Sequence, residues 1–151
     1  MKKISVFLSF FLLCLSSFAF RSPGVLEKVK DSFYVYFPNA KKVNWQEFPD
    51  ATKVSFIDGD IQERIIFSKD ESDIQFFRYY KGEHLLLPIQ LILKKKFPGL
   101  TVYGVTEITT VSQINNELIL KYGLILEDAT KWYSIQMDSN GTITELKKYK
   151  K

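Results

Sequence analysis

The sequence predicts an α+β fold in which a helix followed by antiparallel strands occurs twice. Two observations lead to this prediction. One amphipathic stretch runs into Phe37-Pro38 and another into Phe97-Pro98, and short alternating segments separated by turn residues follow each of them. Because segments joined by such short turns pair antiparallel, we expect one sheet built from both repeats. The two helices should pack on one face of it, leaving the other face at least partly open to water.

The N-terminal segment has the composition of an export signal. Two lysines precede an uncharged apolar segment, residues 4–20, and Ser17 and Ala19 are the small residues that a signal peptidase requires. We therefore expect residues 1–19 to be a signal peptide that is cleaved after Ala19. The remaining chain would be periplasmic or secreted, with no stable membrane insertion. The alternatives are an uncleaved anchor and a lipoprotein linked through Cys14, although a leucine precedes that cysteine where a small residue is needed.

The remaining residues, 20–151, are predicted to form a single domain made of two repeats, at about 22–83 and 84–151. The whole sequence carries a formal net charge of +4, an excess too small to indicate a nucleic-acid partner. Its one cysteine lies in the signal segment. The exported domain would therefore contain no disulfide and no cysteine-based metal site.

In the first repeat, an amphipathic helix is expected from about Pro23 to Phe37, with Ser22 as its N-cap. Four strands should follow, and Asp58-Gly59-Asp60 is the strongest hairpin signal between them. These strands are expected at Val43–Phe48, Thr52–Ile57, Ile61–Phe67 and Ile74–Tyr80.

The second repeat begins with a shorter helix, expected from about Leu87 to Phe97. Its lysines, Lys94–Lys96, lie near the C-terminal end, where cations complement the helix dipole. The run is therefore interpreted as a solvated helix end. Four more strands are expected at Val102–Val111, Leu118–Leu126, Lys131–Met137 and Thr142–Tyr149.

The order of these motifs resembles a known family. Phe37-Pro38-Asn39-Ala40, followed by Val43-x-Trp45, is similar to the start of a PepSY-like, β-lactamase-inhibitor-like (BLIP-like) module. Such modules occur in exported proteins of Bacteroidetes-type bacteria. Leu87-Pro88-Ile89, then Lys96 to Gly99, and a closing hairpin at Asp138 to Gly141 resemble its second half, so the likeness spans nearly the whole exported chain.

The resemblance implies a fold in which two helix-plus-sheet repeats form a broad, curved sheet. Proteins that give the family its name bind and inhibit β-lactamases or peptidases with their sheet and hairpin loops. No loop of this sequence matches their inhibitory loops residue by residue, so no inhibitory residue is transferred. The resemblance therefore concerns the fold and leaves the activity open.

The residues show no pattern typical of catalysis. His84 is the only histidine, whereas a zinc site or a Ser-His-Asp site needs further partners, so we interpret it as an ordinary surface or loop residue. The acidic residues Asp58, Asp60, Asp70, Glu71 and Asp73 lie in predicted turn segments. We therefore expect no enzyme, no metal site and no cofactor. A carboxylate-only hydrolase is an alternative, and it requires two carboxylates facing across a cleft at about 5–10 Å.

Aromatic residues crowd the predicted strands. Because strand residues alternate between faces, Tyr79-Tyr80 and Trp132-Tyr133 must each place one ring on either face. Rings and cations on an open face would resemble a protein-binding surface, whereas the simpler interpretation is that they stabilise the sheet through cross-strand pairs. The candidate partner-binding residues are Trp45, Arg64, Arg78, Tyr79, Tyr80, Lys131, Trp132 and Tyr133.

The sequence therefore favours an exported, non-enzymatic binding module that contacts another protein through its open sheet face and hairpin loops. The module would serve as an inhibitor of, or a scaffold for, an envelope or secreted protein. The alternative is a carrier that holds a small apolar ligand in a cavity between helices and sheet.

Overall fold

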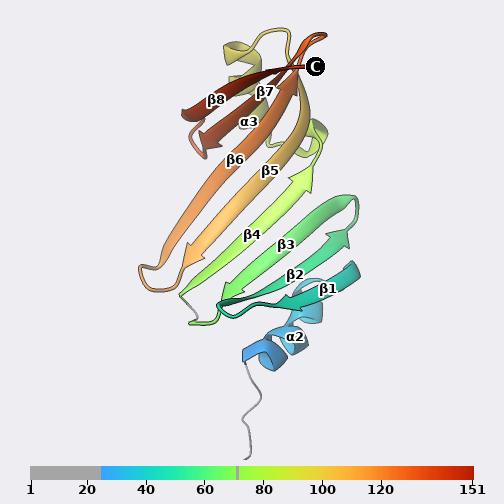
Figure 1. The fold of residues 1–151 in the computed structure, drawn as a ribbon, viewed down its shortest axis with the longest axis vertical. Helices are drawn as coiled ribbons and strands as arrows, with labels where there is room; N and C mark the ends of the chain where they lie inside the picture. The colour runs from blue at the N-terminus through green and yellow to red at the C-terminus, as the bar shows by residue number, and fades with distance from the viewer. Residues whose placement is uncertain (1–24, 71) are drawn as a thin grey trace, which may run out of the picture. The chain divides into compact units, whose positions relative to one another are not determined.

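A computed structural model of the chain describes residues 25–70 and 72–151. The predicted signal peptide, its cleavage site and the predicted N-cap Ser22 lie outside the described residues. Helix α2 (Val25–Tyr36) precedes four strands, and the short 3-10 helix η2 (Gly82–His84) and helix α3 (Leu87–Lys96) precede four more (Figure 1). The strands are β1 (Lys41–Glu47), β2 (Ala51–Asp58), β3 (Ile61–Ser68), β4 (Asp73–Tyr80), β5 (Thr101–Ser112), β6 (Glu117–Glu127), β7 (Lys131–Asp138) and β8 (Ile143–Lys150).

The eight strands of the described residues form one open antiparallel sheet in the order β1 to β8. Each strand pairs with its neighbour in sequence, and β4 pairs with β5 where the two repeats meet (Figure 1). The predicted α+β class, the single sheet and the two helix-plus-four-strand repeats are confirmed. The ends of the strands differ slightly from the predicted bounds, and the helices end one residue earlier than predicted, at Tyr36 and Lys96.

The two Phe-Pro segments end their helices with the same hydrogen bonds. The amide of Phe37 donates to the carbonyl of Phe33 at 2.9 Å, and the amide of Phe97 donates to that of Leu93 at 2.8 Å. In both repeats the amide two residues after the proline then donates to the phenylalanine carbonyl, at 3.2 Å. Because the proline has no N–H and cannot continue the helix, the chain turns here into the first strand of each repeat.

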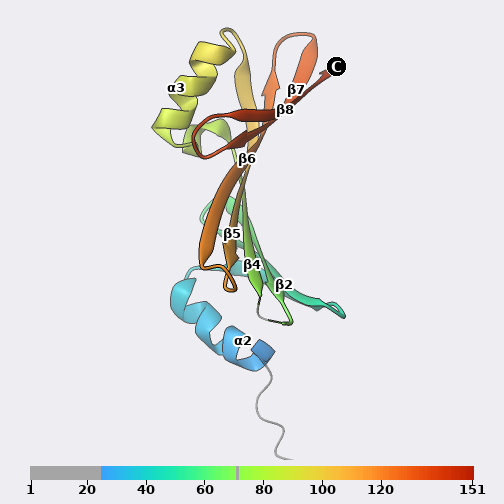
Figure 2. The same cartoon turned by 90° about the vertical axis from the view of Figure 1, so that its left-hand side faces the viewer.

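Two apolar clusters lie on one face of the sheet, which we call the helix-side face. The first contains the buried residues Phe33, Val54, Phe56 and Ile65. The second contains Tyr80, Leu85, Ile89, Leu93, Val105, Tyr122, Leu124, Leu126, Ile135 and Met137. Helix α3 covers this face in the second repeat (Figure 2). All described strand residues that are fully buried lie on this face, so the opposite face, which we call the open face, contributes none of them.

Phe33, in the last turn of α2, anchors the first cluster. Its ring centroid lies 5.0 Å from that of Phe56 and 5.4 Å from that of Trp45, both with edge-to-face geometry. Such arrangements match the positive ring edge to the negative ring face, and they add to the burial of apolar area. The end of α2 and helix α3 therefore both pack on the helix-side face, as predicted.

The outer strands β1 and β8 both carry lysines. In β1 the pairing with β2 is irregular between Lys41 and Asn44, and Lys42 has a φ of 54°. In β8, Lys147 and Lys148 are both exposed. Each edge of the sheet thus carries positive charge, and each edge strand also pairs irregularly with its neighbour at one point.

Candidate functional site

The open face carries a group of side chains that combines cations with apolar surface. The strand register aligns Arg64 of β3, Phe77 of β4, Ile108 of β5 and Lys121 of β6 in one row. Tyr79 lies beside this row, with its ring stacked against Phe77 at a centroid distance of 6.4 Å and an angle of 7°. The Arg64 guanidinium lies 5.5 Å from the Tyr79 ring centroid. We refer to these five residues as the open-face patch.

The open-face patch is positively charged. Neither Arg64 nor Lys121 forms an ion pair with any residue in the described ranges. A cation–π contact with Tyr79 orients the Arg64 side chain instead, so its charge is not compensated. The patch therefore presents a stacked aromatic pair between two free positive charges.

A second aromatic group lies on the open face of the second repeat. Trp132 contacts Tyr103 edge-to-face at a centroid distance of 4.8 Å, and Tyr149 lies opposite Trp132 in the register of β7 and β8. The Nζ atom of Lys151 lies 4.5 Å from a Trp132 ring centroid and 2.6 Å from Oε2 of Glu127. Because Glu127 compensates the charge of Lys151, this group is closer to neutral than the open-face patch.

The sequence-predicted candidates fall on both faces of the sheet. Those on the open face are Arg64, Tyr79 and Trp132. Those on the helix-side face are Trp45, Arg78, Tyr80, Tyr133 and, at the exposed start of β7, Lys131. Adjacent strand residues point to opposite faces, so the eight candidates cannot form one surface. The expected split of the pairs Tyr79-Tyr80 and Trp132-Tyr133 between the faces is confirmed.

Three members of the open-face patch, Phe77, Ile108 and Lys121, are missing from the predicted set, and Lys121 joins the patch through the pairing of β6 with β5. Phe77 lies two positions from Tyr79 in the same strand, and this period-two spacing is the signal that could have identified it. Ile108 joins the patch through the pairing of β5 with β4, which only the strand register reveals. Their role in binding, like that of the predicted candidates, stays a prediction.

On the helix-side face, Arg78 binds two carboxylates at once. Its Nε atom lies 3.3 Å from Oε1 of Glu63, and its Nη1 atom lies 3.3 Å from Oε1 of Glu107. The hydroxyl of Tyr80 donates to Oε2 of Glu107 at 2.7 Å. Glu63, Arg78 and Glu107 share one cross-strand row on β3, β4 and β5, and we refer to them as the ionic row.

The ionic row lies in a partly buried environment, which changes its electrostatics. Burial raises the pKa of the Glu63 carboxyl, and the Oε2 atom of Glu63 is buried without a hydrogen-bond partner in the described chain. Burial and the hydrogen bond to Glu107 both raise the pKa of the Tyr80 phenol. Burial opposes the charge of Arg78, but Glu107 and Glu63 outweigh it and raise the pKa of the guanidinium. Arg78 therefore stays charged.

The ionic row also bears on the hydrolase alternative. Glu63 and Glu107 are brought into one row, but the Arg78 guanidinium binds both of them. A carboxylate-only hydrolase needs its two carboxylates to face a substrate across an open cleft. The geometry thus fits a structural ion network better than an acid–base pair.

His84 lies beside acidic residues that sequence reasoning did not connect with it. Its Nε2 atom is 2.8 Å from Oδ2 of Asp60, at the β2–β3 turn, and 3.8 Å from Oε1 of Glu83. The hydrogen bond from His84 lowers the pKa of the Asp60 carboxyl. The three ligand atoms lie within 4.8 Å of one another, so these exposed residues could together hold a metal ion. The 24-residue separation of His84 and Asp60 hides this proximity from a sequence pattern.

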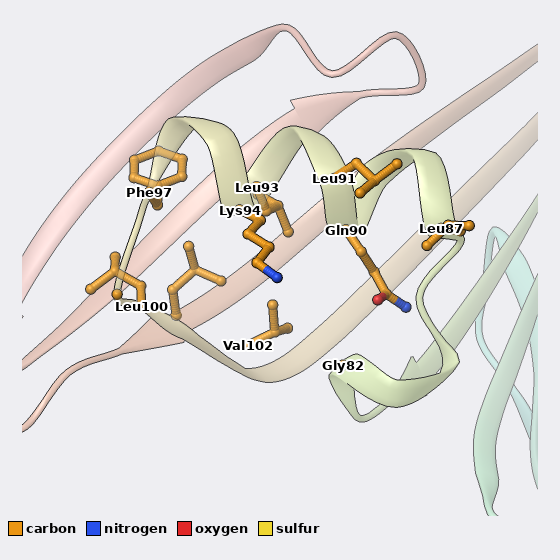
Figure 3. Close-up of a pocket in the computed structure, with 11 residues that line it drawn as sticks. Gly82, Leu87, Gln90, Leu91, Leu93, Lys94, Phe97, Leu100 and Val102 are labelled. Carbon is orange, nitrogen blue, oxygen red and sulfur yellow. The ribbon is translucent and has the colours of Figure 1, made fainter.

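A groove of about 400 Å³ lies between α3 and the strands beneath it (Figure 3). Helix α3 contributes Leu87, Leu91 and Lys94 to it, and β5 contributes Val102. Among the described residues its lining is mainly apolar and includes no acidic side chain. A space of this size between helix and sheet is what the apolar-ligand alternative requires, and ligand binding there stays a prediction.

Comparison with known proteins identifies the fold. No protein-family model matches the sequence, and a search of curated proteins also finds no match. A solved BLIP-like protein from Bacteroides fragilis superposes with a TM-score of 0.56, at 10% identity, over 85% of this chain and 89% of that protein. The chain has the fold of BLIP-like proteins.

Other solved structures share this BLIP-like fold. A candidate periplasmic protein from Bacteroides eggerthii gives a TM-score of 0.56 at 13% identity, over 81% of this chain and 87% of that one. A DUF2874 family protein from Bacteroides uniformis gives a TM-score of 0.54 at 13% identity, over 80% of this chain and 86% of that protein. The predicted likeness to BLIP-like proteins of Bacteroidetes-type bacteria is thus confirmed for the fold, while its PepSY part stays a prediction. Within the described ranges, no helix is long and apolar enough to cross a membrane.

Proposed function

We propose that the protein is an exported, non-enzymatic binding module that contacts the acidic, partly apolar surface of another protein through the open-face patch. The observation that carries the proposal is the pairing of two cations with half-buried aromatic rings on the open face. Arg64 and Lys121 flank Phe77 and Tyr79, and neither cation forms an ion pair within the described chain, although Asp138 is the register partner of Lys121 on β7. Tyrosine and arginine are over-represented among the residues that dominate binding energy at protein interfaces.

The layout of the sheet supports this proposal. The packed cores lie on the helix-side face, so the aromatic rings of the open face are not needed to fill a core. Charge complementarity then favours a partner with carboxylates, because two uncompensated cations attract them and repel basic surfaces. Export to the periplasm or beyond is part of the proposal and rests on the N-terminal signal pattern.

The BLIP-like fold fits this role. Eight antiparallel strands give a continuous surface on which a partner can be held without a catalytic residue set. The partner would be an envelope or secreted protein that the module inhibits or holds in place. The experiment is affinity purification from the native envelope with the wild type and with Arg64→Glu, followed by identification of the retained proteins and binding measurements with each purified candidate.

The matched control is Lys95→Glu, which makes the same charge reversal at an exposed residue of α3, on the helix-side face. We expect a partner that binds the wild type and Lys95→Glu alike but binds Arg64→Glu at least about ten-fold more weakly, since a close charge pair is replaced by repulsion. Equal binding of all three proteins would refute the proposed surface.

A further inference from the structure

We infer that the groove beneath α3 binds a monomeric amphiphile that has a single acyl chain and a carboxylate headgroup. This site is separate from the open-face patch because α3 lies on the helix-side face of the sheet (Figure 2). The inference does not depend on the proposed protein partner. It rests on exposed leucines, on one unpaired lysine and on the size of the groove.

The apolar part of the ligand is indicated by two leucines on the rim. Leu87 and Leu91 line the groove, yet 66% and 58% of their respective surfaces are exposed. Their four-residue spacing places them on the same side of α3, as Figure 3 shows. Leucines of a short amphipathic helix normally face the core, so this strip of apolar surface is uncovered. An acyl chain lying along it would remove that surface from water.

The headgroup is indicated by Lys94. It is the one charged residue among the described residues that line the groove, and its ammonium group lies on the groove side of α3, above Val102 (Figure 3). Lys94 forms no hydrogen bond or ion pair with any residue in the described part of the chain. A free ammonium beside apolar walls, with no acidic residue lining the site, is complementary to a carboxylate attached to an apolar chain.

The neighbouring lysines of α3 are placed differently. Lys96 donates from Nζ to the carbonyl of Gly141 at 2.9 Å and thereby ties α3 to the β7–β8 turn. Lys95 is exposed and does not line the groove. Of the three consecutive lysines, only Lys94 therefore combines a free charge with a position in the groove.

The dimensions of the groove set the length of the chain. A methylene group occupies about as much space as a water molecule in the liquid, roughly 30 Å³, so about 400 Å³ holds roughly a dozen such groups. One side of the groove is closed by a tight contact between η2 and β5. A Cβ atom at Gly82 would lie 2.7 Å from Cβ of Val102, so no side chain fits between them. A single twelve-carbon chain therefore matches this volume.

The test is calorimetric titration of the protein with dodecanoate below its critical micelle concentration. We expect saturable one-to-one binding to the wild type. Lys94→Gln should bind roughly ten-fold more weakly, since a charged hydrogen bond is lost, and the matched variant Lys95→Gln should bind like the wild type. Leu91→Asp should also weaken binding, and circular dichroism should show that each variant keeps its sheet.

Two further ligands make the test specific. Dodecyltrimethylammonium has the same chain length and the opposite charge, and we expect it to bind at least about ten-fold more weakly than dodecanoate. Vesicles of phosphatidylglycerol test a membrane surface as the source of the anion, and we expect no binding that depends on Lys94. The inference would be overturned if dodecanoate did not bind, if Lys94→Gln bound it as the wild type does, if both amphiphiles bound equally, or if only vesicles bound.

Discussion

Arg78→Leu tests whether the ionic row is held together by its central guanidinium. The substitution leaves the carboxylates of Glu63 and Glu107 without a counter-charge. Both are mostly buried, because only 6% and 13% of their respective side-chain surfaces are exposed. Removing one partner of a buried ion pair costs about 3–5 kcal/mol of unfolding free energy. Because 35% of the Arg78 side chain is exposed, water reaches the site, and we expect a loss at or just below the lower end of this range, about 2–3 kcal/mol near pH 7.

The pH dependence of this loss follows from the carboxylates. Burial already raises the pKa of Glu63, and removal of the guanidinium raises it further. For an acid whose pKa is raised on folding, the contribution to stability is fully present below the pKa of the unfolded chain and is lost as the pH rises through the folded pKa. The difference between Arg78→Leu and the wild type should therefore be larger near pH 7 than near pH 4.

The assay is urea unfolding monitored by tryptophan fluorescence at both pH values. Arg64→Leu is the matched control, because Arg64 lies on the neighbouring strand β3, faces the opposite side of the sheet and has no ion pair in the described ranges. Its loss of unfolding free energy should stay within about 1 kcal/mol. Replacing both carboxylates by glutamine in the Arg78→Leu background should restore most of the stability. Equal losses for the two arginine variants, or a loss for Arg78→Leu that does not change with pH, would refute the reasoning.

Three further predictions use the same unfolding measurement. Ile135→Ala should lower the free energy of unfolding by about 2–5 kcal/mol, because Ile135 is 0% exposed. Its register partner Leu146 is 42% exposed, so Leu146→Ala should lower it by less than about 1 kcal/mol. Similar losses for the two variants would contradict the placement of the core. Tyr80→Phe should cost about 1.5–3 kcal/mol, because it removes a hydrogen bond to the charged Glu107, and a neutral result would mean that this bond contributes little. Gly59→Ala should lower the free energy of unfolding by about 1–2 kcal/mol, because Gly59 has a φ of 62°, a left-handed conformation that a residue with a Cβ atom disfavours. Unchanged stability would show that the turn relaxes.

Local features of the sequence were sufficient to predict the meander. The Asp58-Gly59-Asp60 turn, the two Phe-Pro helix ends and the alternation of each strand are all encoded within a few residues. Since each strand pairs with its neighbour in sequence, no long-range pairing had to be inferred. This is why the antiparallel pairing and the approximate bounds of the strands could be predicted, whereas their order in the sheet is seen in the structure.

The surfaces were harder to predict because they depend on the register between strands. Alternation shows that Arg78 and Tyr79 lie on opposite faces, but it does not show which of these faces the helices cover. A charged residue within a strand is usually taken to face solvent, whereas Arg78 pairs with Glu63 and Glu107, 15 and 29 positions away. Only the pairing of β3, β4 and β5 brings these three charges together.

The lysines on the two outer strands have a consequence for how copies of this protein behave at high concentration. An open sheet has two rims of unpaired backbone N–H and C=O groups, which can recruit further strands and start fibre growth. Lys41 and Lys42 beside the bulge of β1, and Lys148 and Lys150 on β8, place like charges on both rims. When two such rims approach each other their charges repel, so the protein can keep a wide sheet and still resist self-association.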